Sequence, residues 1–192
     1  MKSEKEPEIL KEYFDHSLKI MTGDITRIKA QGIVNAANSG LLGGGGVDGA
    51  IHAAGGPAIL SACRELRRTA YPEGLPPGQA ALTTAGNLPA AWVIHTVGPV
   101  WQGGDQGEEE TLKAAYANCL RLAGQKELES LSFPAVSTGV YGFPKDRAAR
   151  IVLEIMKDHF SSGGLPHQIM LVYFTRRDAE VLLAAAGELG LS

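Results

Sequence analysis

The chain has 192 residues, of which 44% are hydrophobic and 20% are charged, and its formal net charge is −3 with a pI of about 6.0. This length and composition predict one globular domain with a sizeable core. The acidic balance argues against a surface that follows nucleic-acid phosphates, and the chain contains no apolar run long enough to predict a membrane span.

The first 16 residues are polar and charged, and we expect them to form a lead-in at the edge of a single domain over residues 17–192. They lack the apolar centre of a signal peptide. Cys63 and Cys119 are far apart and form no CxxC pair. Both are therefore interpreted as buried apolar side chains of a reducing compartment, rather than as a disulfide or a metal pair. The expected location is the cytoplasm.

From Leu18 onward, short apolar runs alternate with segments of helical periodicity. Glycine and proline separate several of these segments. Residues 55–57 end one helix and begin another, and Pro144 stands in the first turn of a later one. In chain order the pattern predicts strands at 18–23, 32–37, 79–86, 91–98, 131–136 and 168–174, and helices at 47–55, 57–69, 108–124, 144–160 and 176–189.

Strands that alternate with helices predict an α/β fold, here a three-layer α/β/α sandwich. Most of the strands are apolar runs, as expected when helices cover both faces of a parallel sheet. Residues 79–97 also fit a β-hairpin with a turn at 87–89. The central sheet is therefore expected to be mixed and mostly parallel.

Three polar or glycine-rich segments, residues 23–26, 35–49 and 137–144, stand at predicted strand ends. In an open α/β sheet, ligands bind at the carboxyl ends of strands. Four consecutive glycines at 43–46 leave backbone N–H groups uncovered directly before a helix, which suits an anion. The third segment repeats this arrangement, and neither loop contains lysine or arginine. Two such loops facing each other predict a diphosphate site built mainly from backbone amides.

A simpler interpretation is that both loops are flexible connections, because glycine-rich loops are common. Two familiar nucleotide-binding motifs are not matched. The GxGxxG spacing of a Rossmann fold with a later acidic residue fits poorly, and no GK[ST] of a Walker loop follows the glycines. Polar loops at several strand ends together favour a ligand site.

Five motifs carry a resemblance to a known family: GDIT at 23–26, VNAAN at 34–38, GGGGVDGAIH at 43–52, HTVGPVW at 95–101 and STGVYGFP at 137–144. In this order and spacing they resemble the macro domain family over roughly residues 18–185. GGGGVDGAIH is similar to the hydrolytic branch with the human MacroD proteins and the bacterial O-acetyl-ADP-ribose deacetylases. The resemblance implies binding of ADP-ribose and cleavage of an ester at its distal ribose. No cofactor is expected, and the sequence suggests no metal requirement.

The resemblance also implies roles for individual residues. Asp24 should accept a hydrogen bond from the adenine amino group beside the Ile25 backbone. Phe174 should stack on adenine, although YFTRRD departs from the family's commoner acidic run after this strand. Asn38 should bond a hydroxyl of the distal ribose, and Asp48 should lie near its reactive end. The other implied contacts, to the diphosphate and the distal ribose, come from Gly45, Gly46, Val47, Ser137, Thr138, Gly139, Val140, Tyr141 and Gly142.

An ester is cleaved when water attacks its acyl carbon, which requires an oriented water, a base and stabilisation of the oxyanion. We predict that Asp48 is the base, with the ligand's own phosphate as an alternative, and that Asn38 fixes the ribose. The implied substrates are O-acetyl-ADP-ribose and proteins mono-ADP-ribosylated on aspartate or glutamate. The plainer alternative for Asp48 is that it caps its helix or orders the loop.

Other candidates have plainer interpretations. His52 and His95 are interpreted as packed histidines, and the acidic run at 108–110 as a solvated helix start. The sequence shows no metal-ligand spacing and no Ser-His-Asp or Cys-His arrangement. Three rival functions remain: an ADP-ribose reader without turnover, a regulatory protein that binds a nuclease or RNA, and an NAD-dependent oxidoreductase. The missing Rossmann spacing disfavours the last.

Overall fold

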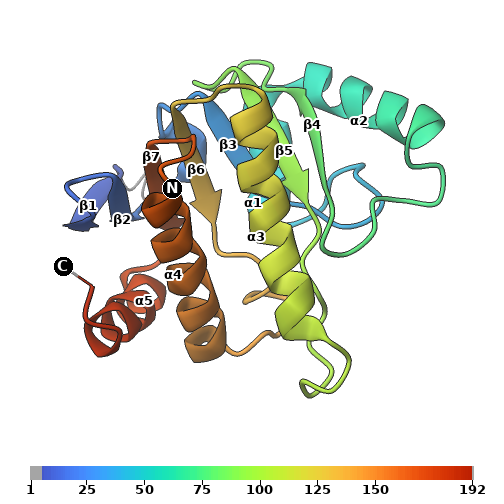
Figure 1. Ribbon diagram of the computed structural model, residues 1–192. Helices are drawn as coiled ribbons and strands as arrows, with labels where there is room; N and C mark the ends of the chain where they lie inside the picture. The colour runs from blue at the N-terminus through green and yellow to red at the C-terminus, as the bar shows by residue number, and fades with distance from the viewer. Residues whose placement is uncertain (1–5, 192) are drawn as a thin grey trace.

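The computed structural model describes residues 6–191, which fold around one seven-stranded sheet (Figure 1). Its strand order is β1-β2-β7-β6-β3-β5-β4. The strands from β2 to β5 in this order run parallel, whereas the edge strands β1 and β4 are antiparallel to their neighbours. The predicted mixed, mostly parallel sheet is thus confirmed. The strands are β1 (Glu8–Tyr13), β2 (Leu18–Thr22), β3 (Gly32–Ala36), β4 (Ala80–Thr84), β5 (Trp92–Thr96), β6 (Ser130–Pro134) and β7 (Gln168–Tyr173).

Helices cover both faces of this sheet, which confirms the predicted three-layer sandwich. Side chains of α3, α4 and α5 pack on one face, and side chains of α1 and α2 pack on the other. In Figure 1, α3 and α4 stand in front of the sheet. The helices are α1 (Gly46–Gly55), α2 (Pro57–Thr69), α3 (Glu108–Gln125), α4 (Lys145–Ser162) and α5 (Arg176–Glu188), with a short 3-10 helix η1 (Ile25–Arg27) after β2.

Alternate side chains of the central strands belong to two separate cores. Ile33 of β3 and Val93 of β5 lie in the core beneath α1 and α2, whereas the residue after each lies in the other core. This alternation follows from the two-residue period of a strand. Because both faces are covered, a polar residue inside such a strand is buried too. Asn35 of β3 and His95 of β5 are both fully buried.

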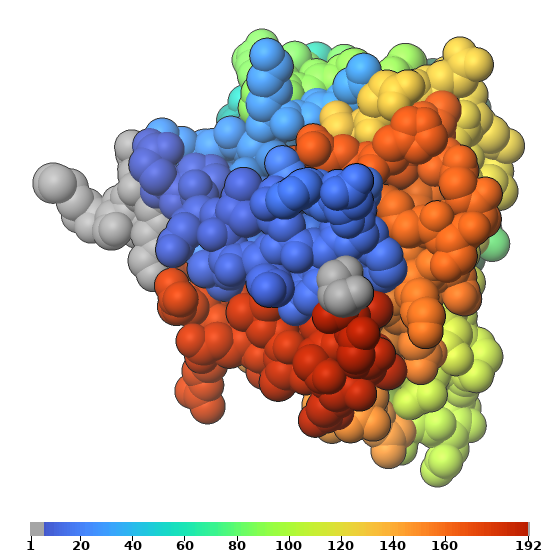
Figure 2. Space-filling model, turned by 60° about the vertical axis from the view of Figure 1, so that its left-hand side comes forward, coloured from blue at the N-terminus to red at the C-terminus, as the bar shows by residue number. Residues whose placement is uncertain are grey.

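The lead-in expected over residues 1–16 contains a strand that the sequence pattern did not reveal. β1 pairs with β2 and has a bulge between Ile9 and Lys11. Only its last side chain is buried, so β1 lacks the apolar run that marks the central strands. Figure 2 shows β1 and β2, in blue, against the C-terminal helix α5, in red. Residues 1–5 lie outside the described part of the chain.

The two cysteines are buried and unpaired, as the sequence predicted. Burial raises the pKa of the Cys119 thiol to about 12, so this side chain is an unreactive apolar group. Among the helices of residues 6–191, none is both long and apolar enough to cross a membrane.

Candidate active site

The polar segments at the strand ends meet at one edge of the sheet. β2, β7, β6 and β3 are parallel neighbours, so their carboxyl ends lie side by side. Along this edge the order is Asp24 after β2, Phe174 after β7, Ser137 after β6 and Asn38 after β3. Neighbouring strands lie about 4.8 Å apart, so the four strand ends span about 14 Å. This edge suits an elongated ligand that successive loops contact in turn.

At the β2 end of this edge, the Asp24 carboxylate follows β2 and the exposed Phe174 ring follows β7, and these two strands are paired. Asp24 Oδ1 accepts hydrogen bonds from the Thr26 backbone N–H at 2.9 Å and from its hydroxyl at 2.7 Å, which caps η1. The Gly23 N–H donates to the Tyr173 carbonyl at 3.0 Å and closes the end of the β2–β7 pair. Phe174 is 77% exposed, so its ring is free to cover a planar ligand group.

The loop after β6 is closed on itself and leaves several N–H groups unused. The Phe143 N–H donates to the Ser137 carbonyl at 3.0 Å, and the Gly142 N–H donates to the Gly139 carbonyl at 3.0 Å. The N–H groups of residues 137–141 donate to no other group of residues 6–191. Helix α4 begins just beyond, at Lys145, and adds the positive end of its dipole. This arrangement suits an anion.

Ser137 begins this loop with a left-handed backbone, at a φ of 65°. Its side chain is 8% exposed, and its Oγ has no hydrogen-bond partner within the described residues. A methyl group on Gly98 would lie 2.0 Å from that oxygen, so only glycine fits there. Non-glycine residues with positive φ cost energy and are concentrated at functional sites.

Glu108 organises the neighbouring loop, which corrects the interpretation of residues 108–110 as a uniformly solvated helix start. Its side chain is buried, and its carboxylate accepts the N–H groups of Gln102 at 2.9 Å, Gly104 at 3.1 Å and Gln106 at 2.7 Å. Burial opposes its ionisation, but these N–H groups prevail and lower the pKa of Glu108 to about 2. In the same loop, the backbone N–H of Trp101 donates to the Tyr141 carbonyl at 2.8 Å. Glu108 therefore supports the loop after β6 from outside the ligand edge.

At the β3 end, an amide and a carboxylate face one glycine. A methyl group on Gly44 would lie 3.1 Å from Asp48 Oδ2 and 3.2 Å from Asn38 Nδ2. Asn38 Nδ2 donates to the Gly43 carbonyl at 3.1 Å and holds the glycine loop. Asp48 stands in the first turn of α1 and is 4% exposed, and it makes no capping hydrogen bond to that helix. The capping alternative for Asp48 therefore has no support in this geometry.

A chain of buried polar side chains lies behind Asp48. Asn35 Nδ2 donates to Asp48 Oδ1 at 2.7 Å and lies 3.1 Å from His95 Nδ1. His95 Nε2 lies 2.8 Å from Thr83 Oγ1 and 3.7 Å from Cys63 Sγ. His95 is therefore a satisfied buried histidine, as predicted, but its partners connect it to the carboxylate.

Asn35 had no predicted role, although the sequence held a signal for it. It follows Ile33 by two positions, so in a strand it faces the same core, which α1 covers. Asn35 stands directly beside His95 in the register of β3 and β5. A buried asparagine requires hydrogen-bond partners, and that requirement points to the polar groups of α1 and β5.

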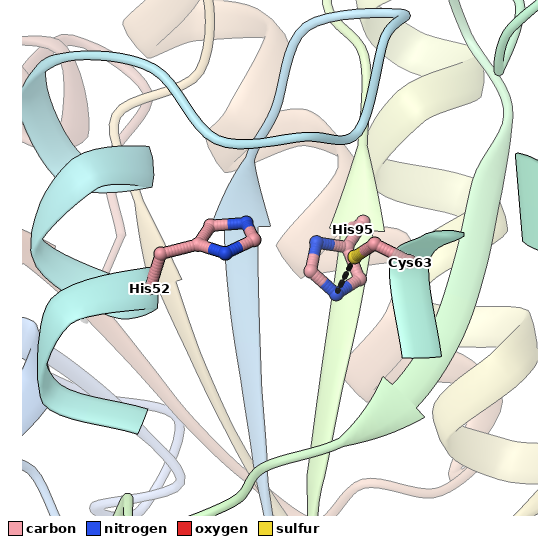
Figure 3. A group of neighbouring side chains, drawn as sticks. All are labelled: His52, Cys63 and His95. Atoms are coloured by element: carbon pink, nitrogen blue, oxygen red, sulfur yellow. Dashed lines mark hydrogen bonds between the residues drawn. The ribbon is translucent and has the colours of Figure 1, made fainter. Parts of the chain in front are cut away.

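Three possible metal ligands lie close together beside this row of buried polar side chains (Figure 3). The ligand atoms of His52, Cys63 and His95 lie within 4.8 Å of one another, and His52 of α1 points toward His95. Imidazole and thiolate are ligands that zinc prefers. However, both ring nitrogens of His95 already have partners. Burial, with the charge of Asp48 as second cause, raises the pKa of Cys63 to about 11. A metal would have to displace these partners and ionise a buried thiol, so the cluster is better explained as polar core.

Comparisons with known proteins identify relatives of the chain by sequence. The family model described as "Macro domain" matches residues 34–152. A macro domain-containing protein from Cupriavidus necator is 55% identical over 157 residues, which are 82% of this chain and 90% of that protein. A protein from Escherichia coli strain K12 named O-acetyl-ADP-ribose deacetylase is 46% identical over 174 residues, which are 89% of this chain and 97% of that protein.

A solved structure shares the whole architecture. The Oceanobacillus iheyensis macrodomain with ADP has a TM-score of 0.90 and 41% sequence identity to this chain. The match covers 96% of this chain and 98% of that one. The likeness therefore extends over nearly the whole chain.

Proposed function

The chain belongs to the macro domain family, and from this premise we propose that it binds ADP-ribose and hydrolyses O-acetyl-ADP-ribose to ADP-ribose and acetate. The name of the Escherichia coli relative and the ADP in the Oceanobacillus iheyensis structure support this proposal. The observation that carries it is the buried Asp48 carboxylate. Asn35 holds one of its oxygens, and the other has no partner within residues 6–191.

The order of the strand ends suggests how the ligand lies. Adenine would sit between Asp24 and Phe174, the diphosphate on the N–H groups of the loop after β6, and the distal ribose at Asn38 beside Asp48. The length of this edge matches an extended dinucleotide-like ligand. The further contacts in this arrangement come from Ile25, Gly45, Gly46 and Val47 near the two ends, and from Thr138, Gly139, Val140, Tyr141 and Gly142 around the diphosphate.

In the proposed reaction, Asp48 Oδ2 takes a proton from a water whose oxygen attacks the acyl carbon. The bond from that carbon to the ribose oxygen then breaks, and the ribose oxygen leaves as a hydroxyl with the proton returned to it. The products are ADP-ribose and acetic acid, which keeps the second proton of the water until it ionises to acetate. Aspartate is a weak base, so precise placement of the carboxylate and the water must supply much of the acceleration. The ligand's phosphate remains the alternative base.

Esters of the same ribose on aspartate or glutamate side chains form a second proposed substrate class. Leu42 and residues 44–46 are exposed, so the ribose end of the edge is open toward solvent. A larger acyl group, such as a modified protein, would then extend outward from the same position. The chemistry at the acyl carbon is identical for both classes.

The test is single-turnover hydrolysis of O-acetyl-ADP-ribose by wild type and Asp48→Ala, with calorimetric measurement of ADP-ribose affinity. We expect Asp48→Ala to bind ADP-ribose and to lose about 100-fold or more in rate, because the loss of a general base typically costs 10²–10⁴-fold. Asp158→Ala, an exposed aspartate of α4, is the matched control. If wild type binds ADP-ribose but cleaves neither ester class, the protein is a reader and the proposal is wrong.

A further inference from the structure

Four side chains from four elements form one hydrogen-bonded chain that ends on Asp48. It runs from Thr83 of β4 to His95 of β5, to Asn35 of β3 and to Asp48 of α1, with contacts of 2.8, 3.1 and 2.7 Å. None of the four is more than 4% exposed. Because water does not reach these groups, the chain itself must satisfy their polar atoms.

One assignment of protons gives every contact of this chain a donor and an acceptor. The Thr83 hydroxyl donates to the Thr84 carbonyl at 3.0 Å, so Thr83 Oγ1 can accept from His95, which assigns the ring proton to His95 Nε2. Burial lowers the pKa of His95 to about 3, with the charge of His52 as the second cause, so the ring is neutral near pH 7. His95 Nδ1 then has a lone pair available for a donor.

This lone pair selects one of two orientations of the Asn35 amide. The observed orientation gives one N–H to His95 Nδ1 and the other to Asp48 Oδ1, and it leaves Asn35 Oδ1 without a partner. If the Asn35 amide were rotated by about 180°, its carbonyl oxygen would point at the Asp48 carboxylate instead of its N–H. A ring with its proton on Nδ1 would favour that opposite orientation. The tautomer of His95 therefore either supports or opposes the amide orientation that holds Asp48.

We propose that His95 is a positioning residue: held by Thr83 in the tautomer protonated on Nε2, it orients Asn35 so that Asp48 presents its free oxygen to the reacting water. This inference rests on the proposed function and deepens it. The His95 ring has hydrogen-bond contacts with Asn35 and Thr83 and lies beside Cys63 and His52, but it makes no hydrogen bond to Asp48, so its hydrogen-bonded path to the carboxylate runs through Asn35.

The other titratable groups nearby do not replace Thr83. His52 Nε2 lies 3.4 Å from Asp48 Oδ1, at the end of the hydrogen-bonded chain opposite Thr83. Cys63 Sγ lies 3.7 Å from His95 Nε2, and sulfur is a weak acceptor. Without the Thr83 hydroxyl, His95 Nε2–H would lose its good acceptor, and the other tautomer would become competitive.

The experiment compares Thr83→Val with Thr83→Ser. Valine keeps the shape of threonine and removes the hydroxyl, whereas serine keeps the hydroxyl and removes a methyl group. We expect Thr83→Val to lower the single-turnover rate about 10-fold or more, because small displacements of a reacting group are costly, with little change in ADP-ribose affinity. Thr83→Ser should recover most of this rate despite its smaller side chain. Imidazole nitrogen NMR should place the His95 proton on Nε2 in wild type and show a shift toward Nδ1 in Thr83→Val.

Three results would overturn the positioning role. These are a wild-type rate in Thr83→Val, an equal loss of rate in Thr83→Ser, and a His95 proton on Nδ1 in wild type. Retained ADP-ribose affinity shows that each variant is folded. If wild type itself cleaves no ester, the proposed function fails as well, whereas turnover that is equal in wild type and Thr83→Val removes the positioning role alone.

Discussion

The two glycine-rich loops of the candidate site are built in opposite ways. The loop at 40–46 leads to Asp48, which is 4% exposed and held by a buried asparagine. The loop at 137–142 offers backbone N–H groups, and Val140 at its tip is fully exposed. A reacting carboxylate requires one orientation, which buried side chains enforce. An anion requires only N–H groups, which any sequence that adopts the loop supplies. Turnover and affinity should therefore respond to substitutions in different loops.

Among substitutions in the two loops, the largest effect is expected from Gly44→Ala, which crowds the first loop. Its methyl group would press on both Asp48 Oδ2 and Asn38 Nδ2, at 3.1 and 3.2 Å. We expect the rate at saturating O-acetyl-ADP-ribose to fall about 10–100-fold, because the reacting groups are displaced. In Gly45→Ala the added methyl meets no protein atom within 4 Å, so any effect should appear in affinity rather than in rate. An equal fall in rate for both variants would contradict the assignment of chemistry to Asp48 and Asn38.

The next effect concerns the second loop and should appear in binding. Gly142 has a φ of 69°, and alanine there costs about 1 kcal/mol, which corresponds to roughly a 5-fold loss of ADP-ribose affinity if the loop relaxes. The rate at saturation should stay close to wild type. Gly187→Ala in α5 is the control, because this glycine has neither a positive φ nor a neighbour within 4 Å of an added methyl. Calorimetry of both variants checks the difference, and a rate defect without an affinity defect in Gly142→Ala would refute it.

A smaller, pH-dependent effect is expected where Glu108 supports the second loop. The pKa of Glu108 in the folded protein is about 2, below its ordinary value of 4.5, so its contribution to stability is complete above pH 4.5 and is lost as the pH falls toward 2. Glu108→Gln should unfold about 5 °C below wild type at pH 7. Thermal unfolding at several pH values should show this gap narrowing below pH 4.5. A gap that stays constant down to pH 2 would mean that another feature of the variant causes it.

The smallest expected effect is that of metal removal, which tests whether the buried cluster behind Asp48 is a metal site. Both nitrogens of His95 are engaged in hydrogen bonds, so we expect EDTA to leave hydrolysis unchanged. The measurement is the rate of wild type after treatment with chelator and removal of the chelate. Activity lost on this treatment and restored by one divalent ion would assign His52, Cys63 and His95 to a metal.

The sequence predicted the parts of the fold that leave a pattern along the chain. Central strands are apolar because both of their faces are covered, and the helices repeat their apolar positions, so both were found. β1 is an edge strand whose only buried side chain is Tyr13, and its charged composition resembled a loose tail. An exposed edge strand such as β1 owes its structure to pairing with a neighbour, and pairing leaves little trace in one sequence.

The candidate site also has parts that the sequence predicted and parts that it did not. Its loops were visible because glycine runs and strand ends are local features. The role of Glu108 was not visible, and the signal at Asn35 was only that a buried asparagine needs partners, because the partners depend on which atoms meet in space. Glu108 stands in an acidic run that looks solvated, yet it closes a loop through three backbone N–H groups. Asn35 and His95 are 60 positions apart and become neighbours only through the register of β3 with β5.

The closed end of the β2–β7 pair brings together residues from near both termini of the chain. Asp24 and Phe174 are 150 positions apart, and the Gly23 N–H to Tyr173 carbonyl bond joins the strands just before them. A ligand that contacts both Asp24 and Phe174 binds only when β2 and β7, the first and last parallel strands in the sequence, are paired. By mass action, ligand at 100 times its Kd would then oppose opening of the sheet by about 2.7 kcal/mol. Occupancy of the site would thus lengthen the protein's survival against proteases.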